Sequence, residues 1–194
     1  MLKEFILFTL LSTVTLIAKP IVYDFKTIDR TQWQQTGTWD LNQTDSKHPL
    51  SLLTRSKGDF NLCYTRSVSL LDSNLSVSFR ANAGSIDQGG GLMWRVQDGE
   101  NYYVARFNPL EDNFRFYIVH AGLRSQLASA EVKLSAGWHT MRIEQKGERL
   151  KGYLDNKLYL EHSDKQLAKA GGVGVWTKAD AQTSFSALTI EGGK

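Results

Sequence analysis

The sequence predicts an all-β protein in which two antiparallel sheets pack into a sandwich. Between Gly89 and Ile190 the chain repeats one pattern, in which five to eight residues of alternating apolar and polar character are followed by a Gly, Asn or Asp turn. This pattern is typical of antiparallel strands with one buried face. No segment has a convincing amphipathic helical period, and the many short strands favour two packed sheets.

Each expected strand is a short apolar run that ends at a turn. In chain order the strands cover residues 22–26, 37–41, 61–66, 75–81, 91–96, 102–108, 114–120, 125–128, 138–145, 149–154, 157–161, 172–178 and 183–191. The segments QDGE, EDN, HAG, KGE and DNK lie between the later runs and supply residues that tolerate tight backbone geometry. Neighbouring strands should therefore pair as hairpins, and Asn156 suits a positive φ.

Residues 1–18 have the features of a signal peptide. Lys3 precedes an uncharged apolar run from Phe5 to Ala18, which has the length of a signal-peptide core and is short for a membrane span. We expect cleavage after Ala18 and export to the periplasm or beyond, with no membrane contact after cleavage; an uncleaved anchor is the alternative. No Pro-rich, Ser-rich or charged linker interrupts residues 19–194, so one domain is expected there.

Composition narrows the class of protein. The chain is 41% hydrophobic and 22% charged, as an ordinary globular protein is, and its net charge of +3 does not imply a nucleic-acid partner. Cys63 is the only cysteine, which excludes an intrachain disulfide and indicates a buried position. We expect a monomer.

Strand alternation separates core side chains from exposed ones, because successive residues point to opposite faces. The side chains assigned to the core are Leu92, Trp94, Val96, Tyr103, Ala105, Phe107, Phe114, Phe116, Ile118, Val173 and Val175. Trp138 is also expected in the core. The side chains assigned outward are Met93, Arg95, Tyr102, Arg106, Asn108, Arg115, Tyr117, Trp176 and Lys178.

The polar and aromatic members of the outward set suit carbohydrates. Sugar hydroxyls accept hydrogen bonds from Arg and Asn, and the C–H faces of a sugar ring pack against aromatic planes. Several arginines would also favour carboxylated or sulfated sugars. The alternative is that these residues are ordinary solvated side chains on a twisted sheet.

Catalytic motifs are missing from the sequence. There is no HExxH, paired cysteine or histidine motif, Walker loop or GxSxG, so no metal site is expected from motifs. A glycosidase needs two carboxylates facing each other across the bond. Five acids are candidates, but no spacing singles out a pair: Asp98, Glu100, Glu144, Asp155 and Asp180.

The run GGGLMWRVQDGENYYVARFNPLEDNFRFYIVH, continued to AGGVGVWTKADAQTSF, resembles the concanavalin A-like lectin/glucanase superfamily. More narrowly, it is similar to the secreted bacterial group of 3-keto-disaccharide hydrolase-like, or family 16 glycoside hydrolase-like, proteins. The resemblance implies a β-jelly roll with a concave sugar-binding sheet. By position it implies ligand contacts from Arg95, Arg106, Asn108, Trp176, Lys178 and Asp180.

The chain departs from this superfamily at three places. The Glu-x-Asp-x-x-Glu strand of family 16 glucanases is absent, which argues against retaining endoglucanase activity. Some members have a calcium site on the convex face; where their aspartates stand, this chain has Ser186 and Ala187. The opening segment typical of the keto-disaccharide hydrolases is not recognisable around Asp24 to Trp33.

Three functions are therefore open. The first is an exported, lectin-like carbohydrate-binding domain that uses the outward patch. The second is an enzyme acting on glycosides, with 3-keto-disaccharides as the candidate substrate and Glu144 or Asp180 as base. The third is a structural or adhesion module that contacts another protein.

Overall fold

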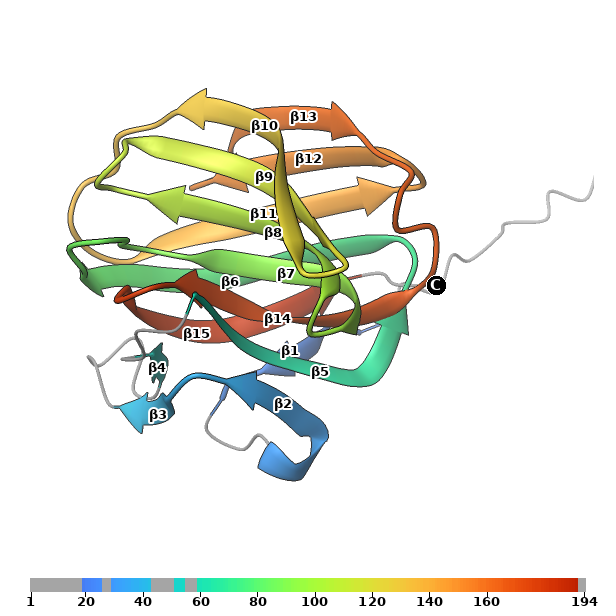
Figure 1. Cartoon of the computed structure of the whole chain (residues 1–194), viewed down its shortest axis with the longest axis horizontal. Coiled ribbons are helices and arrows are strands. Elements are labelled where there is room, and N and C mark those ends of the chain that lie inside the picture. Colours follow the sequence, from blue (N-terminus) through green and yellow to red (C-terminus); the bar gives the residue numbers. More distant parts are fainter. Residues whose placement is uncertain (1–18, 26–28, 43–50, 55–58, 192–194) are drawn as a thin grey trace, which may run out of the picture.

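A computed structural model of the chain describes residues 19–25, 29–42, 51–54 and 59–191 (Figure 1). The expected signal peptide, residues 1–18, lies outside the described residues. The described chain forms two antiparallel sheets and one 3-10 turn, η1 (Arg30–Gln32). Among these residues no helix is long and apolar enough to cross a membrane.

The first sheet has eight strands. Along it the order is β13-β12-β11-β6-β15-β4-β3, and β1 also pairs with β15. Their bounds are β1 (Ile21–Tyr23), β3 (Trp39–Asn42), β4 (Ser51–Thr54), β6 (Ser73–Ala83), β11 (His139–Lys146), β12 (Arg149–Leu154), β13 (Lys157–Ser163) and β15 (Gln182–Glu191).

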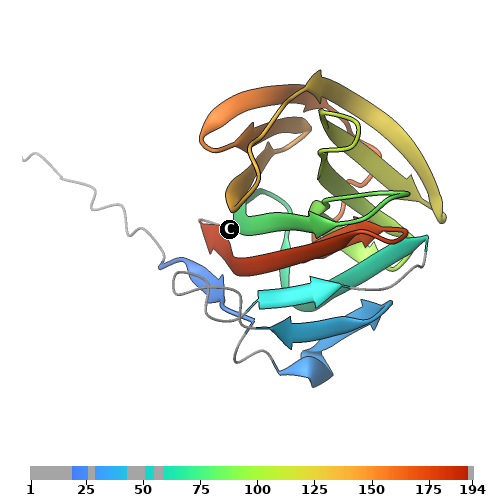
Figure 2. The same ribbon diagram turned by 90° about the vertical axis from the view of Figure 1, so that its left-hand side faces the viewer.

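The second sheet has seven strands, in the order β10-β9-β8-β7-β14-β5-β2. Their bounds are β2 (Trp33–Thr36), β5 (Phe60–Leu70), β7 (Gly91–Asp98), β8 (Asn101–Asn108), β9 (Asn113–His120), β10 (Leu123–Glu131) and β14 (Gly171–Lys178). Figure 2 shows β10 and β13 meeting at one side of the sandwich, where the two strands are in contact.

The predicted two-sheet sandwich is confirmed, and most predicted strands are present. The turn at Asp155 and Asn156 has positive φ at both residues, 48° and 67°, as a tight hairpin requires. Two strands, β2 and β4, were not predicted, because each is only four residues long and too short to establish a period.

The core between the sheets contains the side chains assigned to it, with two exceptions. Trp94 is fully buried and stacks on Tyr103 with 5.5 Å between ring centroids. The placement of Trp138 in the core is wrong: this ring is only half-buried and lies 5.5 Å from the guanidinium carbon of Arg80.

The second exception is Val96, which packs on the outer face of the seven-stranded sheet with Met93. Arg95 has a φ of +46°, and the β7 register shifts beside it, so the strand bulges there. A bulge adds one residue to the strand and reverses the faces beyond it. Simple alternation therefore fails on the part of β7 that begins at Arg95.

The outer face of the seven-stranded sheet is buried near its centre. Its edge strand β10 pairs with β9 along its length, with one register shift between Gln126 and Ala128. A second apolar cluster, which includes Met93, Tyr102 and Trp176, is buried on this face. The outer face is thus divided into a covered centre and open ends.

Candidate functional site

Seven polar side chains gather at one end of the outer face of the seven-stranded sheet, where β8 turns into β9. We call this group the Glu111 cluster: Asp87, Arg106, Asn108, Glu111, Asn113, Arg115 and Tyr117. Strands β8 and β9 supply five of them, the turn between these strands supplies Glu111, and the loop before β7 supplies Asp87.

Two arginines face each other across the strands of this cluster. Arg106 and Arg115 are direct cross-strand partners, an arrangement that destabilises a sheet unless the charges are compensated. Glu111 compensates both, since its two carboxylate oxygens lie 3.1 Å from Arg106 Nη2 and 2.8 Å from Arg115 Nη1. Tyr117 Oη accepts hydrogen bonds from both guanidinium groups, at 3.2 and 3.3 Å.

The deeper half of the cluster is a buried ion pair. Arg106 is 2% exposed, and its Nη2 lies 3.2 Å from Oδ1 of the equally buried Asp87. Burial raises the pKa of Asp87 above its ordinary value, although the charges of Arg106 and Lys178 act in the opposite direction. The Nε of Arg106 and the Oδ1 of Asn113 are buried without a hydrogen-bond partner in the described structure.

The shallower half faces solvent. The Glu111 side chain is 44% exposed, and Arg115 is partly exposed beside it. Burial raises the pKa of Glu111, but hydrogen bonds from Asn113 and Arg106 and the two arginine charges outweigh this effect and lower the pKa to about 2. The cluster therefore offers an ionised carboxylate and a guanidinium at the surface, in fixed positions.

Asp180 holds the loop that carries Asp87. Its carboxylate accepts the backbone N–H groups of Ser85, Ile86 and Asp87 at 2.9 to 3.0 Å, and also the Ser85 hydroxyl at 2.8 Å. These donors lower the pKa of Asp180 far below its ordinary value. Asp180 therefore acts as a positioning residue for the cluster.

Three predicted contact residues lie elsewhere on the outer face. Tyr102 and Trp176 are fully buried in its centre, where Trp176 Nε1 donates to Tyr102 Oη at 3.2 Å. Lys178 is half-exposed at the end of β14, and its charge opposes the rise that burial causes in the pKa of Asp87. The prediction that Tyr102 and Trp176 lie at an open surface is wrong, because both side chains are fully buried in the apolar cluster of this face.

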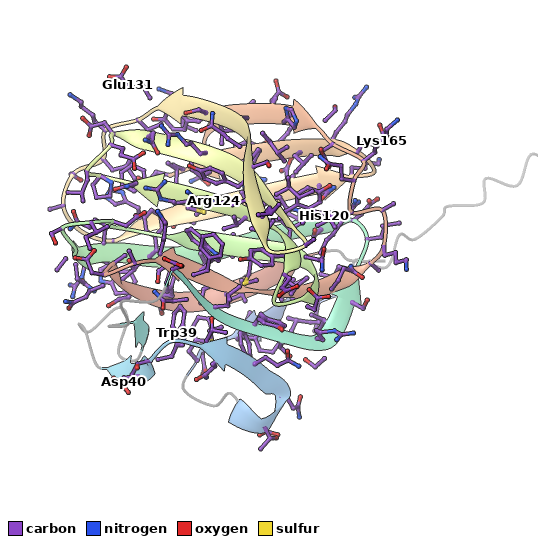
Figure 3. The ribbon with its side chains drawn as sticks, in the orientation of Figure 1. Trp39, Asp40, His120, Arg124, Glu131 and Lys165 are labelled. Carbon is purple, nitrogen blue, oxygen red and sulfur yellow. The ribbon has the colours of Figure 1, made fainter. Side chains whose placement is uncertain are left out.

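Arg124 lies over the central aromatic rings of this outer face (Figure 3). Its guanidinium carbon lies 4.5 Å from the ring centroid of Tyr117, 5.6 Å from that of Phe60 and 5.8 Å from that of Trp176. Such distances allow cation–π attraction. The aromatic rings of this face are thus already occupied by a side chain of the protein itself.

Arg95 belongs to the framework, contrary to the prediction that it contacts a ligand. It is almost fully buried, and its three nitrogens each donate at 2.8 Å to a backbone carbonyl, namely those of Leu71, Gly147 and Leu167. Because the bulge at this residue turns its side chain away from the open surface, Arg95 joins three connecting segments instead.

The predicted catalytic acids are not brought together. Glu144 lies on the outer face of the eight-stranded sheet, whereas Asp180 lies in the turn between β14 and β15. Asp98 accepts a hydrogen bond from the backbone N–H of Glu100 in its own turn, and Asp155 accepts one from the backbone N–H of Thr140 on β11. Within the described ranges, no three His, Cys, Asp or Glu side chains gather where they could hold a metal ion.

Sequence reasoning missed Asp87, Glu111, Asn113 and Arg124. Glu111 and Asn113 belong to the segment EDN, which was predicted only as a turn. They nevertheless lie close in sequence to Asn108 and Arg115, which were predicted to point outward. This closeness in sequence could have predicted Glu111 and Asn113 as members of the site. Asp87 gives no such signal, since its loop is placed at the cluster by tertiary contacts, which are the bridge between Gly90 and Phe107 and the hydrogen bonds to Asp180.

Comparison with known proteins finds no family model that matches the chain. A stretch of 106 residues is 29% identical to levanase of Bacillus subtilis (strain 168); this stretch makes up 53% of the chain and 15% of the levanase. The chain therefore matches only a small part of that protein's length.

Solved structures give a broader match. The carbohydrate-binding module CBM66 from Bacillus subtilis superposes with a TM-score of 0.71 at 24% identity, over 83% of this chain and 96% of the module. The exoplasmic/lumenal domain of VIP36, in a form bound to Ca²⁺ and Man3GlcNAc, has a TM-score of 0.64 at 10% identity, over 90% and 89% of the two chains. At these identities the likeness establishes the fold, and the chain has the concanavalin A-like, or galectin-like, β-sandwich fold.

Proposed function

We propose that the chain is a carbohydrate-binding domain and that the Glu111 cluster is its binding site. The observation that carries the proposal is a partly exposed Arg115–Glu111 pair that is fixed from below by Arg106 and Asp87. Neighbouring sugar hydroxyls donate to a carboxylate and accept from a guanidinium at the same time. The names of the similar folds, a carbohydrate-binding module and a glycan-bound lumenal domain, support the same function.

The charge of the cluster favours a neutral glycan. Within the cluster two arginines are matched by two carboxylates, so the Arg115–Glu111 pair at the surface carries no net charge of its own, although the Lys178 cation lies near Asp87. This differs from the sequence-based expectation, which counted Arg95 among exposed cations. Levan is the first neutral glycan to test, because a stretch of the chain is similar to levanase.

Binding is better supported than glycoside cleavage. Glu144 and Asp180 lie on different parts of the molecule, and Asp87 and Glu111 both contact Arg106 instead of flanking a space for a glycosidic bond. The finer resemblance to 3-keto-disaccharide hydrolases nevertheless gives a defined substrate for the same assay. Calcium belongs in the assay too, since one similar fold is a calcium-bound form.

The test is calorimetric titration of the protein with levan, other neutral glycans, acidic glycans and a 3-keto-disaccharide, with and without calcium. Each mixture is also analysed for reaction products. We expect saturable binding of a neutral glycan, no product, and at least tenfold weaker binding by Arg115→Gln, since hydrogen bonds to charged groups contribute about 1.5–3 kcal/mol. Arg142→Gln on the other sheet is the matched control. Flat titrations throughout, or product from the 3-keto-disaccharide, would overturn the proposal.

A further inference from the structure

The Glu111 cluster supplies polar contacts, but the aromatic rings of the same face do not supply apolar ones. Tyr102 and Trp176 are fully buried, and the ring of Tyr117 is covered by Arg124. A sugar also has C–H faces, whose burial contributes to affinity. Apolar contacts must therefore come from other side chains near the cluster.

Two large aliphatic side chains are exposed beside the cluster. Ile86 is 75% exposed and Leu110 is 51% exposed. Each directly precedes a cluster carboxylate, Asp87 or Glu111, and both carboxylates contact the same nitrogen of Arg106. Ile86 and Leu110 consequently stand on two chain segments that meet at one guanidinium.

Both aliphatic residues are held by backbone hydrogen bonds to polar residues of the site. The N–H of Ile86 donates to Asp180 at 2.9 Å, and the N–H of Leu110 donates to Asn108 at 2.9 Å. The loop of Ile86 is also joined to β8 by two hydrogen bonds of 3.0 Å between Gly90 and Phe107. Isolated exposed aliphatics are ordinary, but two on fixed backbones around one polar cluster resemble the apolar part of a binding site.

We propose that Ile86 and Leu110 form the apolar half of the glycan site and pack against the C–H face of the sugar whose hydroxyls meet Glu111 and Arg115. This inference rests on the proposed carbohydrate-binding function. It also defines the ligand class more narrowly, as neutral glycans that present vicinal hydroxyls on one side and an uncharged C–H surface on the other.

The test compares Ile86→Ser and Leu110→Ser with Leu123→Ser. Leu123 is a matched control, because it is 76% exposed and stands at the start of β10, paired with His120 at the end of β9 that lies away from the cluster. We expect roughly three- to tenfold weaker glycan binding for each of the first two variants, and a less negative heat-capacity change of binding, because less apolar surface is buried. Leu123→Ser should bind as the unaltered protein does, and all three should keep its unfolding midpoint.

The outcomes separate this inference from the function on which it rests. If the unaltered protein binds no glycan, both fail. If it binds, and Arg115→Gln weakens binding while Ile86→Ser and Leu110→Ser do not, the apolar half is wrong and the polar site stands. An equal loss of glycan affinity in Leu123→Ser would also overturn the inference, because the loss would then not be specific to side chains beside the cluster.

Discussion

Two groups of the same residue types lie on opposite sheets of the sandwich and differ in almost everything else. On the eight-stranded sheet, Glu144 contacts Arg142 and accepts a hydrogen bond from Tyr153 Oη at 3.0 Å; we call these three residues the Glu144 triad. The Glu111 cluster also combines glutamate, arginine and tyrosine. The triad comes from two adjacent strands, whereas the cluster joins a turn, two strands and a distant loop.

Their arginines show the difference most clearly. The guanidinium carbon of Arg142 lies 3.6 Å from the ring centroid of Tyr153, so the triad is closed on itself at a solvated sheet face. Arg106 is buried and contacts two carboxylates that are distant in sequence. Burial and the convergence of loops, more than residue type, therefore distinguish a candidate site from a surface ion pair.

The largest expected difference is in stability. Arg106→Met should lower the free energy of unfolding by about 3–5 kcal/mol, because it leaves Asp87 buried without its counter-charge. Arg142→Met should change it by less than about 1 kcal/mol, as partly exposed pairs do. Urea unfolding at neutral pH measures both. Equal midpoints for the two variants would remove the basis of the comparison.

The next difference is in ligand binding. Glu111→Gln keeps the shape of the side chain but loses its charge, so we expect glycan affinity to fall by at least tenfold, since charged hydrogen bonds contribute about 1.5–3 kcal/mol. Glu144→Gln should leave affinity unchanged. Calorimetric titration with the glycan found for the unaltered protein provides the measurement, and a loss in both variants would argue for a site spread over both sheets.

Acid pH should sharpen the comparison further. Folding lowers the pKa of Glu111 from 4.5 to about 2, so the stability that its ionised form contributes is complete above pH 4.5 and is lost as the pH falls toward 2. The fall in urea midpoint between pH 6 and pH 3 should consequently be smaller in Glu111→Gln than in the unaltered protein. Glu144→Gln should reduce this fall less. If the urea midpoint of Glu111→Gln fell as much as that of the unaltered protein, carboxylates other than Glu111 would determine the loss of stability in acid.

The smallest expected effect concerns the loop behind the cluster. Asp180→Asn weakens the hydrogen bonds that three backbone N–H groups donate to this side chain. Hydrogen exchange at residues 85–87 should therefore become faster, and glycan affinity should fall by roughly two- to fivefold. Asp98→Asn, which alters a similar capping aspartate in the turn between β7 and β8, is the control. Unchanged exchange at Ile86 in Asp180→Asn would contradict the positioning role.

Most of the fold could be predicted from the sequence, because alternation and turn residues are local signals. The pattern failed where local signals are weak or misleading, at the four-residue strands β2 and β4 and at the bulge of Arg95. That bulge reversed the face of Val96 and drew Arg95 into the framework. A positive φ at an arginine has no sequence signature, so this error could not be avoided.

The candidate site was predicted only in part. Arg106, Asn108, Arg115 and Tyr117 lie together as alternation indicated, since they stand on two neighbouring strands. The contact of Arg124 with Trp176 joins β10 to β14, which are not neighbours in the sheet, and the contact of Arg106 with Asp87 joins β8 to the loop before β7. Both contacts depend on the tertiary structure, which the local alternation of apolar and polar residues does not predict.

The hydrogen bonds between Asp180 and the loop of residues 85–87 have a consequence for how the ligand preference of such a domain could change. Asp180 contacts two of these three residues, Ile86 and Asp87, through their main-chain amides. A main-chain amide is common to every residue except proline, so the loop would keep its path through most replacements of Ile86. The outermost side chain of the site is therefore free to vary, and new sugar preferences could arise there without rebuilding the sandwich.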